Sequence, residues 1–424
     1  MSPSRTISLG KAWAGNSTNV TPYRHSGLVT VGHRQLLSYY NDNGALTFSE
    51  RSLVGGAVTQ KTVEGVSAPV DAHFSSSIGV DRDGRIHVLA GAHVSKAICL
   101  RSDTESVETV KRVADPVLEK FDITYPAFVT DRRANFHVVF RVGSAARSAW
   151  RTLQWDGAWL EKKGYPLLSG ITEPWSAGPY INTPLADTGQ GFGLFVVWRT
   201  AAIFGSRQRA MNGGIDYLEA DLVTKRLRTW SGAVLPIPAT QAVMERVAAV
   251  PWTASLCNQA GATRLADGRP VGVFYWTHKG RTTVNMLYPD SHGWQLREIA
   301  ELGTPIDLVG RGTLSLPYSR PVCVTLPDGS VFIIYRTMEA GRALVGHRLH
   351  PPDFEKAEVL TLIEEPLGYY EPVVDGLRAQ RDGILSLYVQ KCHSGIDGKA
   401  EFMSSEAYLA EWDFQVSKKG TLSV

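Results

Sequence analysis

Two histidines flank one predicted hairpin in the first quarter of the chain. His73 stands just before the segment 76–90, and His93 follows just after it. This segment runs out to an Asp-Gly turn and returns, so we expect both imidazoles to emerge at the same end of the hairpin. Imidazole gains and loses protons near neutral pH and therefore suits general acid–base catalysis.

The pattern of a polar residue, a strand and a second polar residue recurs along the chain. The next unit carries Tyr125 before its strand and Arg141 after it. A guanidinium is a permanently charged, bidentate partner for a carboxylate. Nearby cations lower the pKa of a tyrosine, and we expect this shift for Tyr125. The remaining pairs of this kind are Tyr180 and Asn182 with Arg199, and Tyr318 and Arg320 with Arg336.

Two other histidines, His87 and His137, lie within predicted strands. Histidines in such places commonly satisfy neighbouring polar groups, so we expect a structural role for both. The chemistry is therefore expected at the strand ends.

A turn that leads into a short apolar run recurs along most of the chain. The turns at 83, 131, 187, 267, 328 and 382 lie 48, 56, 80, 61 and 54 residues apart, which leaves room for four short strands each. The segment 28–48 supplies a degenerate seventh unit. Helical composition is confined to short stretches such as 240–250, and 40 Gly and 22 Pro interrupt the rest. These features predict an all-β, seven-bladed β-propeller that forms a single domain over 1–424, with blades from about residue 19 to residue 415.

Composition argues against two classes of partner. With 44 Lys and Arg against 41 Asp and Glu, the formal charge is +3, so we expect no nucleic-acid and no membrane partner. Residues 1–15 lack the apolar core of a secretory signal. We therefore expect a cytoplasmic protein as written, or a secreted or periplasmic one if a signal has been removed. Four scattered cysteines without CxxC spacing predict reduced, buried thiols.

The residues around the two histidines resemble a known family. The run 71–95 has the form D-x-H, then D-G-x-h-H-V, then x-x-H-x-S, and T-Y-P follows at 124–126 and F-R-V-G-S at 140–144. This pattern resembles the BNR-repeat-like propeller polysaccharide lyases, which include ulvan lyases and rhamnose-glucuronate lyases. Their active centre has two histidines about twenty residues apart, and an arginine sixteen residues after a tyrosine. Here 93 − 73 = 20 and 141 − 125 = 16.

The resemblance is close over 71–143 and looser from about residue 19 to beyond residue 388. The sequence departs from many relatives at Phe74, where they have Asn, and at Val94, where they have a second His or Asn. These departures affect the expected substrate preference.

The resemblance implies β-elimination at a 4-linked glucuronate, in particular a rhamnose-α-1,4-glucuronate bond, within a polysaccharide or oligosaccharide. Tyr125 and His73 would handle the C5 proton and the O4 leaving group in either order, with His93 in support. Arg141 would neutralise the carboxylate, so no metal or organic cofactor is expected for the chemical step. The implied substrate-binding residues are Arg199, Tyr180, Asn182, Arg320 and Tyr318. Some relatives carry a structural metal ion, of whose site Cys392 and His393 would be a fragment.

Two other functions fit parts of the pattern. A sialidase-like glycoside hydrolase would use Arg199, Arg320 and Arg336 to bind a carboxylate. The turns lack the S-x-D-x-G-x-x-W box of sialidases, and no spacing selects a catalytic pair among Asp71, Asp122 and Glu173. A non-catalytic carbohydrate-binding propeller would use the 11 Trp and 15 Tyr for stacking on sugars. Convergence of the two histidines, Tyr125 and Arg141 in one cleft would distinguish a lyase from this scaffold.

Overall fold

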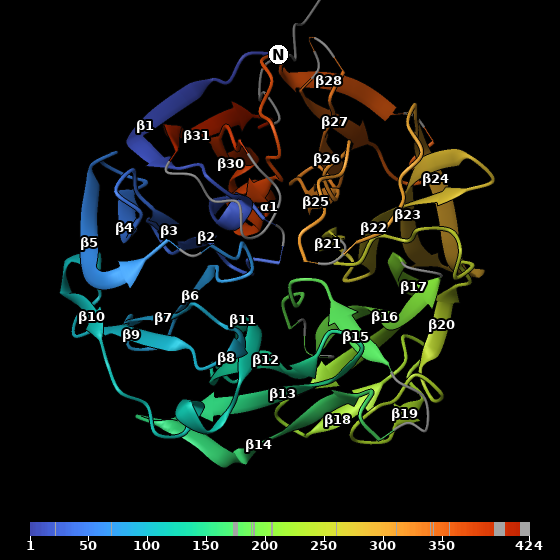
Figure 1. Cartoon of the computed structure of the whole chain (residues 1–424), viewed down its shortest axis with the longest axis horizontal. Helices are drawn as coiled ribbons and strands as arrows, with labels where there is room; N and C mark the ends of the chain where they lie inside the picture. The colour runs from blue at the N-terminus through green and yellow to red at the C-terminus, as the bar shows by residue number, and fades with distance from the viewer. Residues whose placement is uncertain are drawn as a thin grey trace, which may run out of the picture.

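The chain forms seven antiparallel sheets arranged as blades around a central axis, as the computed structural model shows (Figure 1). The structure describes all residues except 22, 69, 173–176, 188, 190, 205–206, 260, 311, 340, 342, 356, 394–402 and 416–424, and it omits the side chains of 201–208. The all-β, seven-bladed propeller predicted from the repeats is therefore confirmed.

Each blade runs from an inner strand at the axis to an outer strand at the rim. Blade 1 contains β2 (Leu28–Val31), β3 (Arg34–Tyr40), β4 (Ala45–Ser52) and β5 (Val58–Ser67). Blade 2 contains β6 (Ser76–Val80), β7 (Ile86–Ala90), β9 (Ile98–Ser102) and β10 (Val110–Arg112). Blade 3 contains β8 (His93–Ser95), β11 (Ile123–Thr130), β12 (Phe136–Ser144), β13 (Arg147–Trp155) and β14 (Trp159–Ser169).

Blade 4 is the widest. It contains β15 (Gly178–Ile181), β16 (Phe192–Phe204), β17 (Arg207–Asp221), β18 (Arg226–Arg228), β19 (Val234–Leu235) and β20 (Glu245–Ala248). Blade 5 contains β21 (Gly261–Arg264), β22 (Pro270–His278), β23 (Arg281–Asp290) and β24 (Gly293–Leu302). Blade 6 contains β25 (Val322–Thr325), β26 (Val331–Arg336), β27 (Leu344–Leu349) and β28 (Ala357–Ile363). Blade 7 contains β29 (Val373–Val374), β30 (Ile384–Gln390), β31 (Ser404–Asp413) and β1 (Arg5–Trp13).

The first strand closes the ring. Strand β1 pairs antiparallel with β31 from Arg5 to Trp13, so blade 7 combines the two ends of the chain. The blades therefore begin at Arg5 and not at about residue 19 as expected. Strand β1 is the outer strand of blade 7, so its pairing with β31 ties the two ends of the chain together and closes the ring of blades.

The predicted turns at 83, 131, 187, 267 and 328 join β6 to β7, β11 to β12, β15 to β16, β21 to β22 and β25 to β26, and the turn at 382 lies at the end of α1, between β29 and β30. In blade 2, Asp81 Oδ1 accepts hydrogen bonds from the backbone N–H groups of Asp83 and Arg85, and its Oδ2 pairs with His87 Nε2 at 2.9 Å. The same arrangement joins Asp131 and His137 in blade 3, at 2.9 Å. His87 and His137 are thus structural, as predicted.

Helical structure is sparse in the described part of the chain. The segment 240–250 forms no helix and instead contributes β20. One α-helix, α1 (Gly376–Asp382), is present among the described residues, with Asp375 as its N-cap and Gly383 in the left-handed conformation after its end. Short 3₁₀ turns occur at Ser17–Asn19, Val107–Thr109 and Leu118–Lys120. No described helix is long and apolar enough to span a membrane. All four cysteines are free and buried, as predicted.

Two long connections reach the face on which the histidine hairpin ends. The segment 14–27, called here the N-terminal loop, links β1 to β2. The segment 303–319 links blades 5 and 6 and is called here the strap. It is fixed to the long β16–β17 hairpin of blade 4 because Ala210 N–H donates to Leu308 O at 3.0 Å and Arg209 pairs with Asp307.

Candidate functional site

Asp71 joins the two predicted histidines. Its Oδ1 lies 2.7 Å from His73 Nδ1, and its Oδ2 lies 2.6 Å from His93 Nδ1. The two imidazoles stack with their centroids 4.3 Å apart. An ionised carboxylate only accepts hydrogen bonds, so each Nδ1 carries the hydrogen and each Nε2 is left with the lone pair in the neutral ring. Burial opposes ionisation of Asp71, but its hydrogen bonds with His73 and His93 outweigh this and hold its pKa well below the usual range.

The backbone around His93 crosses from blade 2 to blade 3. Strand β8 pairs with β11, where His93 lies opposite Thr124. Val94 adopts the left-handed conformation at φ 52°, and its N–H donates to the Thr124 hydroxyl at 2.8 Å. A β-branched residue rarely accepts this conformation, so the crossing is held against strain. The crossing places a side chain from blade 2 beside the inner strand of blade 3.

Tyr125 is positioned by an irregularity in β11. The register between β11 and β12 shifts between Thr124 and Ala127, and Tyr125 has a φ of 53°. Its ring centroid lies 6.1 Å from that of His73, and the Arg141 guanidinium carbon lies 4.6 Å from the Tyr125 ring centroid. The structure thus brings His73, His93, Tyr125 and Arg141 together.

The pKa expected for Tyr125 from its sequence context is wrong. Burial raises the pKa of Tyr125 above its ordinary value, and the neighbouring Tyr180 adds to this, whereas Arg141 and Arg199 only partly oppose it. Arg141 lies over the face of the ring, a geometry that stabilises the neutral ring as well as the ion. Tyr125 is therefore a phenol that keeps its proton near neutral pH.

Arg141 differs from the other buried arginines of the protein. Arg141 is only 1% exposed to solvent. Its Nε and Nη1 have no hydrogen-bond acceptor among the described residues. Arg51 and Arg264, which are similarly buried, pair with Glu411 and Glu219. Arg24 and Arg336 donate to backbone carbonyl oxygens instead. A buried cation with unmet N–H groups is costly, so Arg141 is suited to receive an external anion.

Tyr180 connects Arg141 to Arg199. The Arg199 guanidinium carbon lies 4.3 Å from the Tyr180 ring centroid, and that of Arg141 lies 4.9 Å from it. Arg199 Nη1 donates to the Tyr180 hydroxyl oxygen at 3.1 Å. The other nitrogens of Arg199 donate to the amide oxygens of Asn212 and Asn258. Burial opposes ionisation of Tyr180, but Arg199 and Arg141 outweigh it and lower its pKa below the ordinary value.

Arg320 also reaches the site, but it has a carboxylate of its own. It pairs with Glu371 through Nε at 2.9 Å and Nη2 at 2.6 Å, and its guanidinium carbon lies 5.1 Å from the Tyr23 ring centroid. Tyr23, from the N-terminal loop, stacks on His73 with centroids 4.6 Å apart. Its hydroxyl hydrogen-bonds with that of Thr313 in the strap at 3.1 Å.

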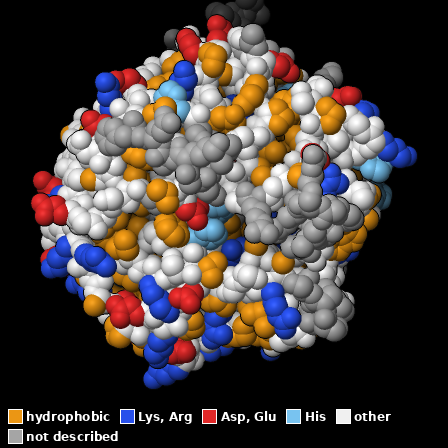
Figure 2. Space-filling view, in the orientation of Figure 1, with side chains coloured by type: hydrophobic (Ala, Val, Ile, Leu, Met, Phe, Trp, Pro, Cys, Tyr) orange, Lys and Arg blue, Asp and Glu red, His pale blue; other side chains and the backbone are white. Residues whose placement is uncertain are grey.

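Part of this cluster lines one cavity of ≈ 450 Å³, whereas His93, Arg141 and Tyr180 lie outside its lining. Its walls include Tyr23, His73, Tyr125, Arg199, Arg320 and Thr313. Figure 2 shows histidine side chains near the centre of this face with acidic side chains beside them. The volume is within the range of small-ligand sites.

Three further residues of the predicted polar pairs do not line this cavity. Asn182 is buried, and its amide oxygen accepts from Phe195 N–H at 2.7 Å, so it joins β15 to β16. The Tyr318 hydroxyl accepts from Thr304 N–H at 2.8 Å and thereby secures the strap. Arg336 is saturated by carbonyl oxygens, so the arginine cluster of a sialidase is not assembled. Asp122 pairs with Lys96 at the surface, and Glu173 lies outside the described residues.

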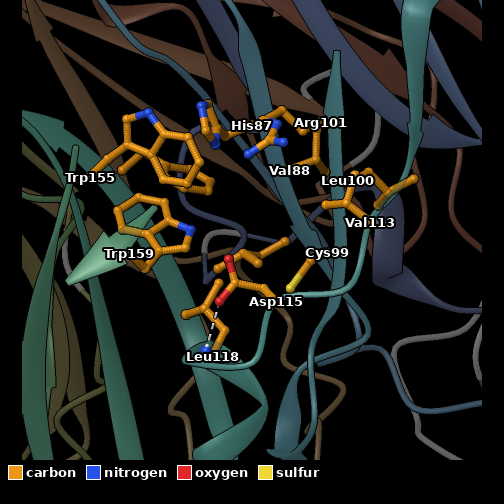
Figure 3. Close-up of a pocket in the computed structure, with 12 residues that line it drawn as sticks. His87, Val88, Cys99, Leu100, Arg101, Val113, Asp115, Leu118, Trp155 and Trp159 are labelled. Carbon is orange, nitrogen blue, oxygen red and sulfur yellow. Dashed lines mark hydrogen bonds between the residues drawn. The ribbon is translucent and has the colours of Figure 1, made fainter. Parts of the chain in front are cut away.

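A second hollow lies between blades 2 and 3. Figure 3 shows Trp155 and Trp159 facing His87 and Arg101 across it. Its volume is only ≈ 10 Å³, which is room for about one water molecule. It belongs to the packing of the two blades and is too small for a substrate.

In the described part of the chain, one group of side chains is close enough together to bind a metal ion. Asp71, His73 and His93 form one group whose potential ligand atoms lie within 4.8 Å of one another. An ion there would have to displace the two hydrogen bonds that hold the histidines. Cys392 is buried and belongs to no such group among the described residues, and residues 394–402 beyond His393 are not described. The metal-site fragment at Cys392 and His393 therefore stays a prediction.

The sequence of the chain matches a family model over residues 34–302, that of the BNR repeat-containing family members. The chain belongs to this family. No curated protein matches the chain in sequence. The match runs from β3 of blade 1 to β24 of blade 5, and thus covers every predicted catalytic residue of this BNR repeat-containing protein.

Solved structures share the fold over nearly the whole of this BNR repeat-containing protein. An ulvan lyase of polysaccharide lyase family PL25 aligns with a TM-score of 0.72 at 12% identity, over 96% of each chain. The same kind of enzyme bound to -[GlcA(1-4)Rha3S]- aligns with a TM-score of 0.68 at 11% identity, again over 96% of each chain. The polysaccharide lyase Uly1 aligns with a TM-score of 0.66 at 12% identity, over 97% of this chain and 100% of that one.

Several site residues are not selected by the sequence. Asp71 stands out there only as a candidate hydrolase carboxylate, although the D-x-H spacing places it beside His73. Tyr23, Thr313 and Glu371 lie far from the histidines along the chain, and no local pattern marks them. Their contacts depend on the paths of the N-terminal loop and the strap across the propeller.

Proposed function

We propose that this protein cleaves the bond to O4 of a 4-linked glucuronate by β-elimination, with rhamnose-α-1,4-glucuronate as the preferred linkage. The observation that carries this proposal is the unmet guanidinium of Arg141 beside two histidines held by one carboxylate. Elimination next to a carboxylate needs a cation for the developing charge, a base and an acid. The cavity and its immediate wall supply all three.

His73 acts as the base in the proposed reaction. The Nδ1–H group of His73 donates a hydrogen bond to Asp71, so its Nε2 carries the lone pair that accepts the C5 proton. The carboxylate of the substrate binds to Arg141 and Arg199, which stabilises the negative charge that develops as the C5–H bond breaks. His93 supports His73 by stacking and by sharing Asp71.

Tyr125 acts as the acid. Its raised pKa keeps the phenol protonated near neutral pH, so it can donate a proton to O4. The electron pair of the C5–H bond forms the C4–C5 double bond while the C4–O4 bond breaks. The proton on His73 then returns to the Tyr125 oxygen, and no water enters the product.

The comparisons support a carbohydrate substrate of this class. One structural neighbour is described as bound to -[GlcA(1-4)Rha3S]-, in which a glucuronate is linked to rhamnose 3-sulfate. A uronate presents one carboxylate, which suits Arg199 in the cavity wall and the buried Arg141 next to Tyr125 and Tyr180. No metal or organic cofactor is needed for this step, since the guanidinium groups supply the positive charge.

The test is an elimination assay on a panel of glucuronate-containing polysaccharides and oligosaccharides. Formation of the conjugated double bond is followed by ultraviolet absorbance, and the reaction is repeated in oxygen-18-labelled water with mass spectrometry of the products. An unlabelled, unsaturated uronate is expected. Quantitative label at a new reducing end without unsaturation would replace the lyase with a glycosidase.

The matched variants are Tyr125→Phe and Tyr39→Phe. Each removes one oxygen from a buried tyrosine, but Tyr39 lies between blades 7 and 1, where its hydroxyl donates to Leu9 O at 3.3 Å. Tyr125→Phe is expected to abolish turnover with its circular dichroism unchanged, whereas Tyr39→Phe keeps it. Full turnover by Tyr125→Phe would remove Tyr125 from the mechanism.

A further inference from the structure

We propose that Tyr180 is an exchangeable counter-ion for Arg141 and Arg199: it releases its phenolic proton readily in the free protein and regains it when a substrate carboxylate binds. This inference rests on the proposed function for the identity of the carboxylate. It adds that binding at this site takes up a proton from solvent.

The geometry places Tyr180 in contact with two guanidinium groups. Arg199 Nη1 donates to its hydroxyl oxygen at 3.1 Å, and the Arg141 guanidinium carbon lies 4.9 Å from its ring centroid. Neither arginine forms an ion pair with a carboxylate among the described residues, although the neighbouring Arg320 does so with Glu371. Tyr180 is therefore the acidic group in direct contact with both cations.

The charges of the surroundings make this oxygen a site for a negative charge. Both guanidinium groups contact the Tyr180 ring, where their charges repel each other, and the buried Arg141 has also lost most of its hydration. Placing one negative charge between them relieves both penalties. This cause explains why the pKa of Tyr180 is lowered although burial of the side chain opposes ionisation.

The other titratable groups near Tyr180 do not take its place. Tyr125 on β11, whose ring centroid is 6.1 Å away, has its pKa raised by burial. His25, which contacts Thr183 beyond β15, has its pKa lowered by burial to about 4 and is neutral above that pH. Arg320 is neutralised by Glu371. Of the groups facing the arginine pair, Tyr180 is the one whose ionisation the pair favours.

Substrate binding brings a second anion to the same pair. A uronate carboxylate at Arg141 and Arg199 supplies the negative charge that the phenolate supplied before. Two anions between two cations repel each other, so the phenolate takes a proton from solvent and remains as a neutral hydrogen-bond partner. By linkage, carboxylate affinity must then fall as pH rises through the pKa of Tyr180, by up to about tenfold per pH unit.

The first experiment is a spectroscopic pH titration of tyrosinate absorbance in the free protein. One tyrosine is expected to ionise below the ordinary tyrosine pKa of about 10, and this step should disappear in Tyr180→Phe. It should persist in Tyr39→Phe, because burial raises the pKa of Tyr39 to about 12. If no tyrosine ionises early, or if the early step survives in Tyr180→Phe, the inference is wrong.

The second experiment measures protons directly. Sodium D-glucuronate is titrated into the protein by calorimetry in buffers of different ionisation enthalpy, with D-glucose as the neutral probe. Proton uptake with glucuronate should increase with pH in the wild-type protein and be absent with glucose and in Tyr180→Phe. A merely structural Tyr180 would change affinity without changing the number of protons.

The outcomes separate this inference from the lyase proposal. Proton uptake that depends on Tyr180, together with no unsaturated product from any uronate substrate, would keep the inference and remove the lyase. Unsaturated product with no proton uptake and no early tyrosine ionisation would do the reverse. If Tyr180→Phe does not fold, the wild-type protein is saturated with glucuronate instead. Loss of the early tyrosinate step would then support the inference, and its persistence would contradict it.

Discussion

Replacing Asp71 by Asn should impair the reaction with little change in shape. The carboxylate accepts from His73 Nδ1 at 2.7 Å, from His93 Nδ1 at 2.6 Å and from His73 N–H at 2.8 Å. An amide offers one oxygen and one NH2 group, so one imidazole meets a donor where it previously met an acceptor. That ring must turn its hydrogen to Nε2, which removes the lone pair that faces the reaction.

The size of the effect follows from the hydrogen bond that the amide cannot accept. One charge-assisted hydrogen bond contributes about 1.5–3 kcal/mol, which corresponds to a roughly 10- to 150-fold fall in kcat. If the ring that turns is the base itself, the fall approaches about 10⁴-fold, as for the wrong histidine tautomer in a serine protease triad. Initial rates of unsaturated product formation measure it.

The protein contains a matched control at the opposite end of the blade. Asp81 holds His87 at 2.9 Å in the same carboxylate–imidazole geometry but away from the cavity. Asp81→Asn should lower the melting temperature and leave kcat nearly unchanged. Comparable losses of kcat in both variants, or near-normal kcat in folded Asp71→Asn, would refute the reasoning.

Three further predictions concern charge, pH and metals. Arg141→Lys keeps the charge but loses the planar fork, so the activation free energy should rise by about 2–4 kcal/mol and kcat/KM should fall accordingly; near-normal kinetics would show that Arg141 only braces the blade. Burial lowers the pKa of His25 to about 4. Between about pH 4 and about pH 6.5 the unfolded chain therefore binds more protons than the folded protein. The free energy of unfolding should drop by about 3 kcal/mol as pH falls through this window. Urea unfolding at both ends of the window should show a smaller drop in His25→Gln, and an equal drop would assign the effect to other groups. A chelator should leave the reaction rate unchanged, and complete loss of activity with intact circular dichroism would contradict a reaction without a metal.

The parts of the fold that were predictable are those set by short stretches of chain. Each turn-and-strand unit contains its own acceptor, as Asp81 shows by binding the backbone two and four residues further on. His73 and His93 could be paired because a hairpin returns its ends to one place, and Tyr125 and Arg141 repeat that arrangement in the next blade. Propeller geometry then brings adjacent blades together at the axis.

The parts that were not predictable depend on how loops cross the axis. Tyr23 and Thr313 meet over His73 although they are 290 residues apart. Arg320 was expected to bind substrate, but Glu371, 51 residues later, already holds its guanidinium. A strand pattern gives no information about such contacts, because loops of different lengths could leave the same blades unchanged.

The two tyrosines show why residue type and proximity do not determine chemical state. Both Tyr125 and Tyr180 lie against Arg141, at similar distances of 4.6 and 4.9 Å from ring centroid to guanidinium carbon. Of the two, only Tyr180 has its oxygen in a hydrogen bond with a guanidinium group among the described residues, that of Arg199 at 3.1 Å. A cation over the ring face also stabilises the neutral phenol and so lowers the pKa only partly, whereas a donor at the oxygen favours the phenolate directly. Burial therefore decides the pKa of Tyr125 and the arginines decide that of Tyr180, so the first is suited to give a proton to a leaving group and the second to exchange one with solvent when an anion arrives.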